Sequence, residues 1–221
     1  MAKALIFDSS TIITLALNNL LYIFAPLKKK FNGHFFITSS VKKEIVDRPM
    51  KMKRFELEAL SILKLIKDEV FEIIDPPQQE TVQLCNIANN TFKARGEFMQ
   101  IMHEGEASCL ALYKALKKQN YKVALVIDER TTRMLCENPL NLLSLFEKKL
   151  HIEVIAKQSN FEEFRRVDII RSAELCFIAY KKGIISLPTS TNEAISALLF
   201  ASKFKGCSIS YEEIDRAISL I

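Results

Sequence analysis

The sequence predicts an α/β fold, a three-layer α/β/α sandwich with a central parallel sheet of four to five strands. Three observations carry this prediction. Short apolar runs alternate with amphipathic helical stretches along the chain, the apolar run at residues 122–127 is nearly continuous, and acidic residues directly follow two of the apolar runs. A strand that is apolar on both faces needs cover on both faces, and helices on each side of a parallel sheet supply it.

The first 50 residues contain two strand–turn–helix units. Residues 4–7 form an apolar run that ends at Asp8, and a helical pattern follows, with its apolar face made by Ile12, Leu15, Ala16 and Leu20. Residues 34–38 repeat the design. Ser39 and Ser40 cap a helix over residues 41–46, which ends before Pro49.

The middle of the chain continues the alternation. The pattern predicts a helix over residues 54–69, a strand over 71–74 that two prolines stop, and a helix over 78–92. A further helix spans residues 107–118, and the strand over 122–127 ends at Asp128. A helical stretch interrupted at Pro139 then leads to a strand over residues 152–155.

Three capping boxes start helices in the last third, each a serine followed three residues later by a glutamate: Ser159 with Glu162, Ser190 with Glu193, and Ser210 with Glu213. Residues 187–189 include a proline and form the one plausible joint. We therefore expect residues 1–186 to form the main domain and residues 187–221 to form a helical pair packed on it.

Composition narrows the function classes. The chain has 221 residues, of which 49% are hydrophobic and 26% charged, so it can bury a substantial core and is not disordered. A net charge of +5 permits a polyanionic partner without requiring one. The five cysteines include no C-x-x-C pair, so we expect buried, reduced thiols in a cytoplasmic protein. The apolar stretch over residues 11–27 contains two asparagines and is too short for a membrane span.

Four acids converge in this topology. Asp8 and Asp128 each follow a strand, Glu44 lies in the helix after the second strand, and Glu106 opens the helix before the Asp128 strand. Parallel strands bind ligands beyond their carboxyl ends, so all four acids are expected at one edge. Clustered carboxylates repel one another unless a cation neutralises them, and all-oxygen ligands suit Mg²⁺ or Mn²⁺. Such an ion supports phosphodiester hydrolysis without a protein nucleophile.

Each acid also has a simpler interpretation. Asp8 and Asp128 suit the N-caps of the helices that follow them, a role that can coexist with metal ligation. Glu44 suits a solvated helix face, and Glu106 suits the positive end of its helix, where Glu104 competes with it for a metal role. The coincidence of all four at one edge favours the functional interpretation.

Four short motifs occur in a characteristic order: LIFDSS at residues 5–10, SVKKEI at 40–45, GEAS at 105–108 and VIDER at 126–130. These segments, which span residues 1 to about 135, resemble those of the PIN domain family, the metal-dependent nucleases named after the PilT N-terminal domain. Residues 169–183 resemble the closing helix of archaeal relatives. The resemblance implies that Asp8, Glu44, Glu106 and Asp128 form the catalytic site. Of these, Asp8, Glu106 and Asp128 would hold the metal, and Glu44 would complete the site or orient water.

The resemblance also implies substrate contacts and partners. Ser10 would occupy the small polar position beside the site, and Arg130 would touch a phosphate or serve as a surface residue. The implied activity is Mg²⁺- or Mn²⁺-dependent cleavage of single-stranded RNA, often by a homodimer, as a VapC-type toxin held by an antitoxin or as an RNA-processing enzyme. The chain is longer than a typical toxin, which weakens the toxin role. The alternatives are a catalytically inactive PIN-like module that binds nucleic acid or assembles with protein, and a nuclease that cleaves DNA flaps.

Overall fold

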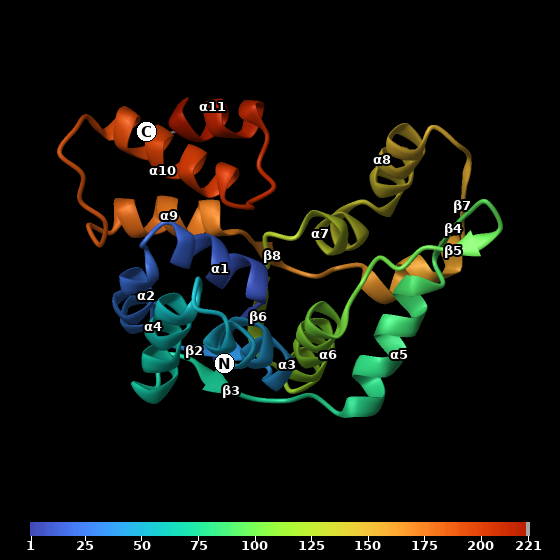
Figure 1. The fold of residues 1–221 in the computed structure, drawn as a ribbon, viewed down its shortest axis with the longest axis horizontal. Helices are drawn as coiled ribbons and strands as arrows, with labels where there is room; N and C mark the ends of the chain where they lie inside the picture. The colour runs from blue at the N-terminus through green and yellow to red at the C-terminus, as the bar shows by residue number, and fades with distance from the viewer. Residues whose placement is uncertain (220–221) are drawn as a thin grey trace.

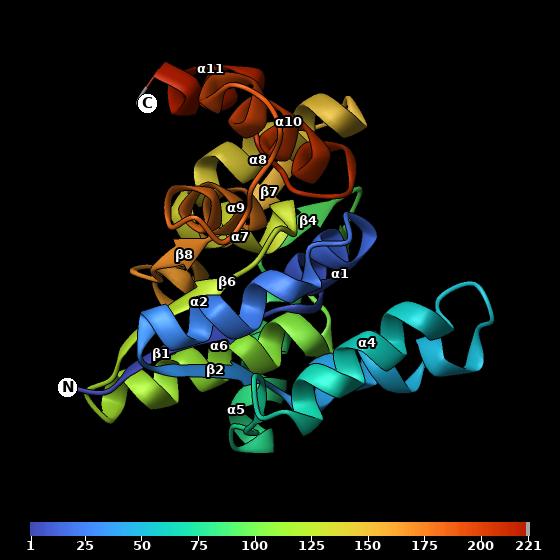
Figure 2. The same ribbon diagram turned by 90° about the vertical axis from the view of Figure 1, so that its left-hand side faces the viewer.

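The computed structural model describes residues 1–219 of the chain. Its central sheet has five parallel strands in the order β3-β2-β1-β6-β8, flanked by helices on both sides (Figures 1 and 2). This confirms the predicted α/β/α sandwich. The central strands are β1 (Lys3–Phe7), β2 (His34–Ile37), β3 (Glu72–Ile73), β6 (Lys122–Val126) and β8 (Ile169–Ile170).

The helices follow the predicted alternation, with shorter bounds at several ends. The N-terminal half contains α1 (Ser9–Leu17), η1 (Leu21–Ile23), α2 (Phe24–Phe31), α3 (Ser39–Lys42), the π-helix η2 (Lys43–Asp47), η3 (Pro49–Lys51), α4 (Glu56–Lys67) and α5 (Gln78–Asn89). The rest contains α6 (Glu104–Lys118), α7 (Arg130–Glu137), α8 (Pro139–Leu150), η4 (Gln158–Phe164), α9 (Ser172–Lys181), α10 (Thr191–Phe204) and α11 (Tyr211–Ser219).

The strand order reverses direction beside β1. From β1 the chain moves outward to β2 and β3, and it later returns to the other side of β1 to form β6 and β8. Right-handed crossovers then place the helices between β1 and β3 on one face of the sheet, and the helices between β3 and β6 on the other. Ligands of open α/β sheets bind in the crevice at such a reversal, here beyond the carboxyl ends of β1 and β6.

A single large core fills both sides of the sheet. Every residue from Ala4 to Phe7 is buried, because β1 is the middle strand and has helices above and below it. Phe7 packs edge-on against Phe24 of α2, with ring centroids 5.4 Å apart, and lies 4.9 Å from the ring of Phe35 in β2. Burial of these rings fixes β1, and with it the position of the residue that follows Phe7.

Two strand predictions differ from the structure. The run at residues 152–155 forms β7 (Val154–Ala156), which joins β4 (Phe92–Ala94) and β5 (Glu97–Phe98) in a separate antiparallel sheet. The fifth central strand is instead the two-residue β8, in a segment expected to be helical. Of the three capping boxes, those at Ser190 and Ser210 form, whereas Ser159 lies inside the 3-10 helix η4, which has no side-chain cap.

Helix α10 packs on α9, which itself contacts α1, and α11 packs on α10 (Figure 1). A second, smaller core joins these helices and is made by Ala173, Ile195, Leu199, Cys207, Ile209 and Ile214. The expected extension over residues 187–221 includes two terminal residues that lie outside the described part.

None of the five cysteines forms a disulfide, and all except Cys85 are buried. Within residues 1–219 no single helix is long and apolar enough to span a membrane; only the pair of segments Ser9–Leu17 and Leu21–Phe31, bent by 116°, passes that test by length and composition together.

Candidate functional site

Asp8 lies directly beyond the carboxyl end of β1 and is 1% exposed. Its Oδ2 accepts hydrogen bonds from the Ser10 amide at 3.0 Å and from the Ser10 hydroxyl at 2.5 Å, so it caps α1 as expected. Its Oδ1 has no hydrogen-bond partner among the described residues. Burial raises the pKa of Asp8 to about 7, and the nearby Glu106 and Glu44 carboxylates add to the rise.

Glu106 and Glu44 approach Asp8 from the helical layers. Glu106 belongs to a capping box at the start of α6, where its carboxylate accepts a hydrogen bond from the His103 amide at 3.0 Å. Burial raises the pKa of Glu106, and the negative charges of Glu44 and Glu129 contribute to this rise. The structure thus brings three of the four predicted acids, Asp8, Glu44 and Glu106, into one electrostatic cluster.

Gly105 makes room for the Glu44 carboxylate. A Cβ atom at position 105 would lie 2.9 Å from Glu44 Oε1, closer than side-chain packing allows. The absence of a side chain therefore lets the first turn of α6 approach the carboxylate of Glu44, a residue of η2 that lies 61 positions earlier. Beside this contact lies an open hollow of about 420 Å³, lined by Ser40, Lys43, Glu44, Arg48, His103, Glu104 and Glu106.

Asp128 is also buried, but its carboxylate is engaged elsewhere. Oδ1 accepts a hydrogen bond from the Ser172 amide at 2.7 Å, at the start of α9, and Oδ2 has no partner among residues 1–219. Phe7 pairs with Val126, so Asp8 is in register with Ile127 and Asp128 is one residue further along. Both acids lie beyond the ends of their strands. Asp128 contacts the start of α9, whereas the charges that act on Asp8 are those of Glu106 and Glu44.

The helix after β6 is capped by Glu129 and not by Asp128, contrary to the N-cap interpretation of Asp128. The Glu129 carboxylate accepts hydrogen bonds from the Thr131 amide at 2.7 Å and from the Thr132 amide at 2.6 Å. Glu129 also contributes to the negative field at Glu106. Sequence reasoning missed this acid, although its position directly after Asp128 and before a helix was a usable signal.

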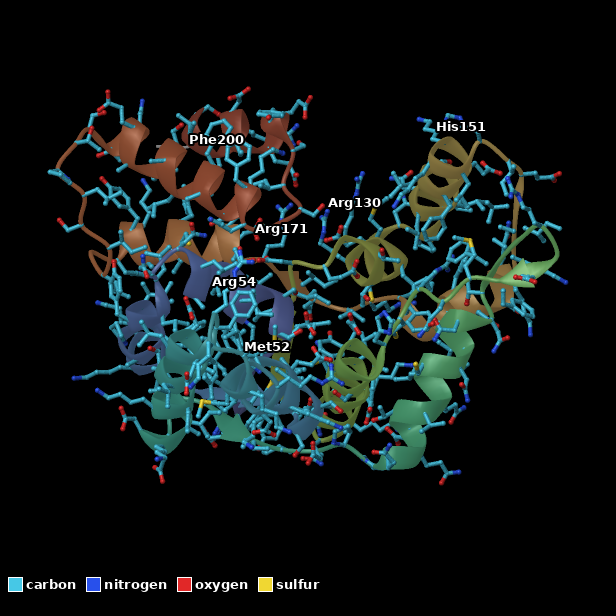
Figure 3. All side chains as sticks on the ribbon, in the orientation of Figure 1. Met52, Arg54, Arg130, His151, Arg171 and Phe200 are labelled. Atoms are coloured by element: carbon cyan, nitrogen blue, oxygen red, sulfur yellow. The ribbon has the colours of Figure 1, made fainter. Side chains whose placement is uncertain are left out.

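Ser10 ties the two strand ends together. Its hydroxyl donates to Asp8 and accepts hydrogen bonds from the Asp128 amide at 3.0 Å and the Glu129 amide at 3.2 Å. These three bonds use the hydroxyl within the protein, so Ser10 positions Asp8 and the backbone beyond β6. Arg130, the other residue predicted to touch substrate, is exposed at the start of α7 and extends towards the C-terminal helices (Figure 3).

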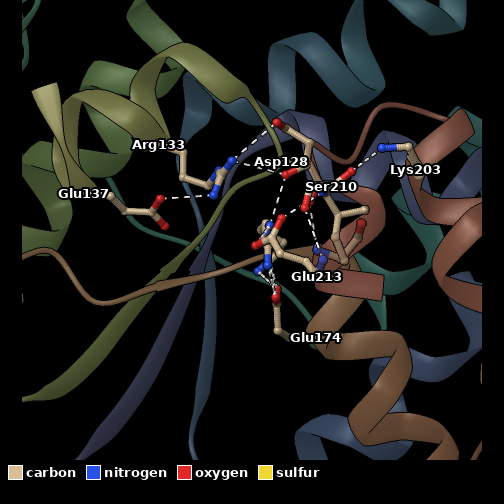
Figure 4. Close-up of polar contacts among 11 residues, drawn as sticks. Asp128, Arg133, Glu137, Glu174, Lys203, Ser210 and Glu213 are labelled. Atoms are coloured by element: carbon tan, nitrogen blue, oxygen red, sulfur yellow. Dashed lines mark hydrogen bonds and ion pairs between the residues drawn. The ribbon is translucent and has the colours of Figure 1, made fainter. Parts of the chain in front are cut away.

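A polar seam holds the C-terminal helices against this edge of the sheet (Figure 4). Arg171, just before α9, donates to the Ser208 carbonyl at 3.0 Å and pairs with Glu213 at 2.9 Å. Arg133 of α7 donates to the same carbonyl at 3.2 Å. The loop between α10 and α11 is thus anchored beside the amide that binds Asp128.

The donor set suits a hard divalent cation. Asp8 Oδ1 and Asp128 Oδ2 are buried oxygens without hydrogen-bond donors in the described residues, an arrangement that is costly unless a cation or water satisfies them. No group of three or more His, Cys, Asp or Glu side chains within residues 1–219 is close enough to hold a metal ion together. Mg²⁺ usually binds through one or two carboxylates and keeps several waters, so fewer than three protein ligands are compatible with it.

Comparison with known proteins agrees with this geometry. A family model described as a PIN domain matches residues 4–140, which includes all four predicted acids. The chain belongs to the PIN domain family. No curated protein and no solved structure matched the chain. The PIN domain assignment supports a nuclease fold, and the matched segment ends in the region of α8, before the C-terminal helices.

Proposed function

We propose that this PIN domain protein is an endoribonuclease that cleaves single-stranded RNA with Mg²⁺ or Mn²⁺. The observation that carries the proposal is the buried Asp8 carboxylate at the strand-order reversal, with an unpaired oxygen and two further carboxylates in its field. A buried acid that is destabilised by its neighbours is typical of a functional site, because a bound cation would relieve the repulsion.

Each residue of the cluster has a distinct task in this proposal. Asp8 and Glu106 would hold the ion, and Asp128, with one oxygen still unpaired, is the third predicted ligand. When bound, the ion would polarise a phosphoryl oxygen and lower the pKa of a water molecule. Glu44 lies beside Gly105, where its carboxylate can accept a proton from water, and Ser10 keeps Asp8 oriented.

The test is cleavage of a labelled single-stranded RNA in Mn²⁺, in Mg²⁺ and in EDTA, with the Asp8→Asn variant purified in parallel. We expect cutting in both metals, none in EDTA and none by the variant. Equal cutting by wild type and variant would reveal a contaminating nuclease and contradict the proposal. A single-stranded DNA and a DNA flap of the same sequence separate RNA cleavage from DNA cleavage.

One observation favours a second candidate, a PIN-like module that binds without cleaving. Asp128 Oδ1 accepts the Ser172 amide, so this acid already serves a structural purpose. Metal-independent RNA or protein binding without turnover would support this candidate.

The proposed substrate and the free thiols suit the cytoplasm. We also propose that the protein acts as a homodimer, or together with an antitoxin or another protein partner. The solution mass of the purified protein tests the homodimer. Inhibition of RNA cleavage by a co-expressed partner distinguishes a toxin from an RNA-processing enzyme.

A further inference from the structure

The π-helix η2 places two cations over the carboxylate site. The Arg48 amide donates to the Lys43 carbonyl at 2.9 Å, a bond that spans five residues where an α-helix spans four. In an α-helix, residues four apart stack on one face, whereas the wider π-turn stacks residues five apart. Lys43 and Arg48 are thereby brought to the same side of the turn, and both line the 420 Å³ hollow that contains Glu44 and Glu106.

Neither cation is neutralised by the acids around it. Within the described part of the chain, Lys43 and Arg48 take part in no ion pair, although Glu44, Glu104 and Glu106 line the same hollow. Their neighbours on this segment differ, since Lys42 pairs with Asp47 at 2.7 Å and Lys53 pairs with Glu56 at 2.9 Å. Lys43 and Arg48 are both exposed, so a ligand can reach them.

A bound divalent cation would remove the charge that opposes phosphate binding. An ion held by Asp8 and Glu106 would neutralise these two carboxylates. Lys43 and Arg48 would then offset Glu44 and Glu104, so the site would carry no net negative charge to repel a phosphodiester. Arginine binds phosphate oxygens with a planar pair of donors, and lysine binds them as a point charge.

The segment that follows the π-turn carries further positive charges beyond Lys43 and Arg48. Lys51 ends η3, and the exposed residues Lys53 and Arg54 follow it before α4; in Figure 2 this loop projects furthest from the sheet on its side of the molecule. A strand of RNA that crosses the carboxylate site could therefore continue along residues 51–54.

We propose that Lys43 and Arg48 form a phosphate clamp, which binds the backbone of single-stranded RNA beside the carboxylates. This inference rests on the proposed ribonuclease function and deepens it, because it names the residues that hold the substrate. The clamp depends on the π-turn, since an α-helical turn would move Arg48 away from Lys43.

The test measures RNA binding separately from cleavage. Fluorescence anisotropy of a fluorescein-labelled single-stranded RNA is recorded over a range of salt concentrations, in EDTA and in Ca²⁺. The variants are Lys43→Ala, Arg48→Ala and Arg48→Lys, and the control is Lys149→Ala, which removes an exposed charge from α8. Circular dichroism melts check that all four fold alike.

We expect each clamp alanine variant to bind more weakly and to reduce the slope of log K against log salt by about 0.7, the value for one lost contact with a single strand. Arg48→Lys should keep the wild-type slope, and Lys149→Ala should match wild type. Equal slopes for the clamp variants and the Lys149 control would overturn the clamp. Binding with these slopes but without cleavage in Mn²⁺ would uphold the clamp and refute the nuclease, whereas cleavage with unchanged slopes would do the reverse.

Discussion

Replacing Asp8 by asparagine removes a buried charge while keeping the shape of the side chain. The asparagine oxygen can accept both hydrogen bonds that Ser10 now donates to Oδ2. Its amide would then occupy the place of Oδ1, which has no hydrogen-bond partner among the described residues. Leaving that amide unpaired costs about 1–3 kcal/mol of folding free energy.

The negative charge of the buried Asp8 carboxylate lowers the stability of the folded protein as the pH rises. The pKa of Asp8 rises from an ordinary 3.8 to about 7 in the folded protein, which corresponds to about 4 kcal/mol when the group is fully ionised. Between these two values the folded protein keeps a proton that the unfolded chain has released, so stability falls as pH rises through this window. From pH 5 to pH 8 the loss is about 3 kcal/mol, and Asp8→Asn has no such loss.

The variant should therefore be less stable than wild type by about 1–3 kcal/mol at pH 5, and equal to it or more stable by up to about 2 kcal/mol at pH 8. Urea unfolding in EDTA at both pH values measures this difference, with Asp68→Asn, an exposed residue at the end of α4, as the charge-removal control. The difference between pH 5 and pH 8 corresponds to roughly 6–12 °C in melting temperature for a chain of this size. A variant that follows the wild-type pH dependence would refute the buried, ionisable Asp8.

Two further predictions concern residues that shape the site. Gly105→Ala should raise the helical stability of α6 by up to about 1 kcal/mol and displace the Glu44 carboxylate. RNA cleavage should therefore fall about 10–100-fold in a protein that melts no earlier than wild type. Unchanged cleavage would contradict a role for Glu44. Ser10→Ala should leave the Asp128 and Glu129 amides without an acceptor. The free energy of unfolding measured in urea should therefore fall by about 1–3 kcal/mol. An unchanged free energy of unfolding would show that water replaces the hydroxyl.

The sequence predicted the architecture because its strongest signals are local. The apolar runs of β1 and β6 and the periodicity of α6 follow from burial on both faces and from helical spacing. The two-residue strand β8 and the β4–β5 hairpin carry no such pattern, because pairing with distant strands creates them.

The sequence predicted which residues form the site more readily than how these residues contact one another. The positions of Asp8, Glu44 and Glu106 follow from topology alone, since strand ends and helix starts gather at one edge. The partner of Asp128 could not be predicted, because the Ser172 amide that it binds lies 44 residues further along the chain. The π-turn at Lys43–Asp47 is also invisible in sequence, because this segment has the composition of an α-helix.

The most direct test of the central claim is the single-turnover rate of RNA cleavage in Mn²⁺ for wild type, Asp8→Asn, Glu106→Gln and the Asp68→Asn control. Loss of a direct metal ligand should cost at least the roughly 100-fold that loss of a supporting residue can cost. We therefore predict that Asp8→Asn and Glu106→Gln slow cleavage by about 100-fold or more while Asp68→Asn cuts like wild type. Wild-type rates in both site variants would contradict the account, because the buried carboxylates would then have no part in the chemistry.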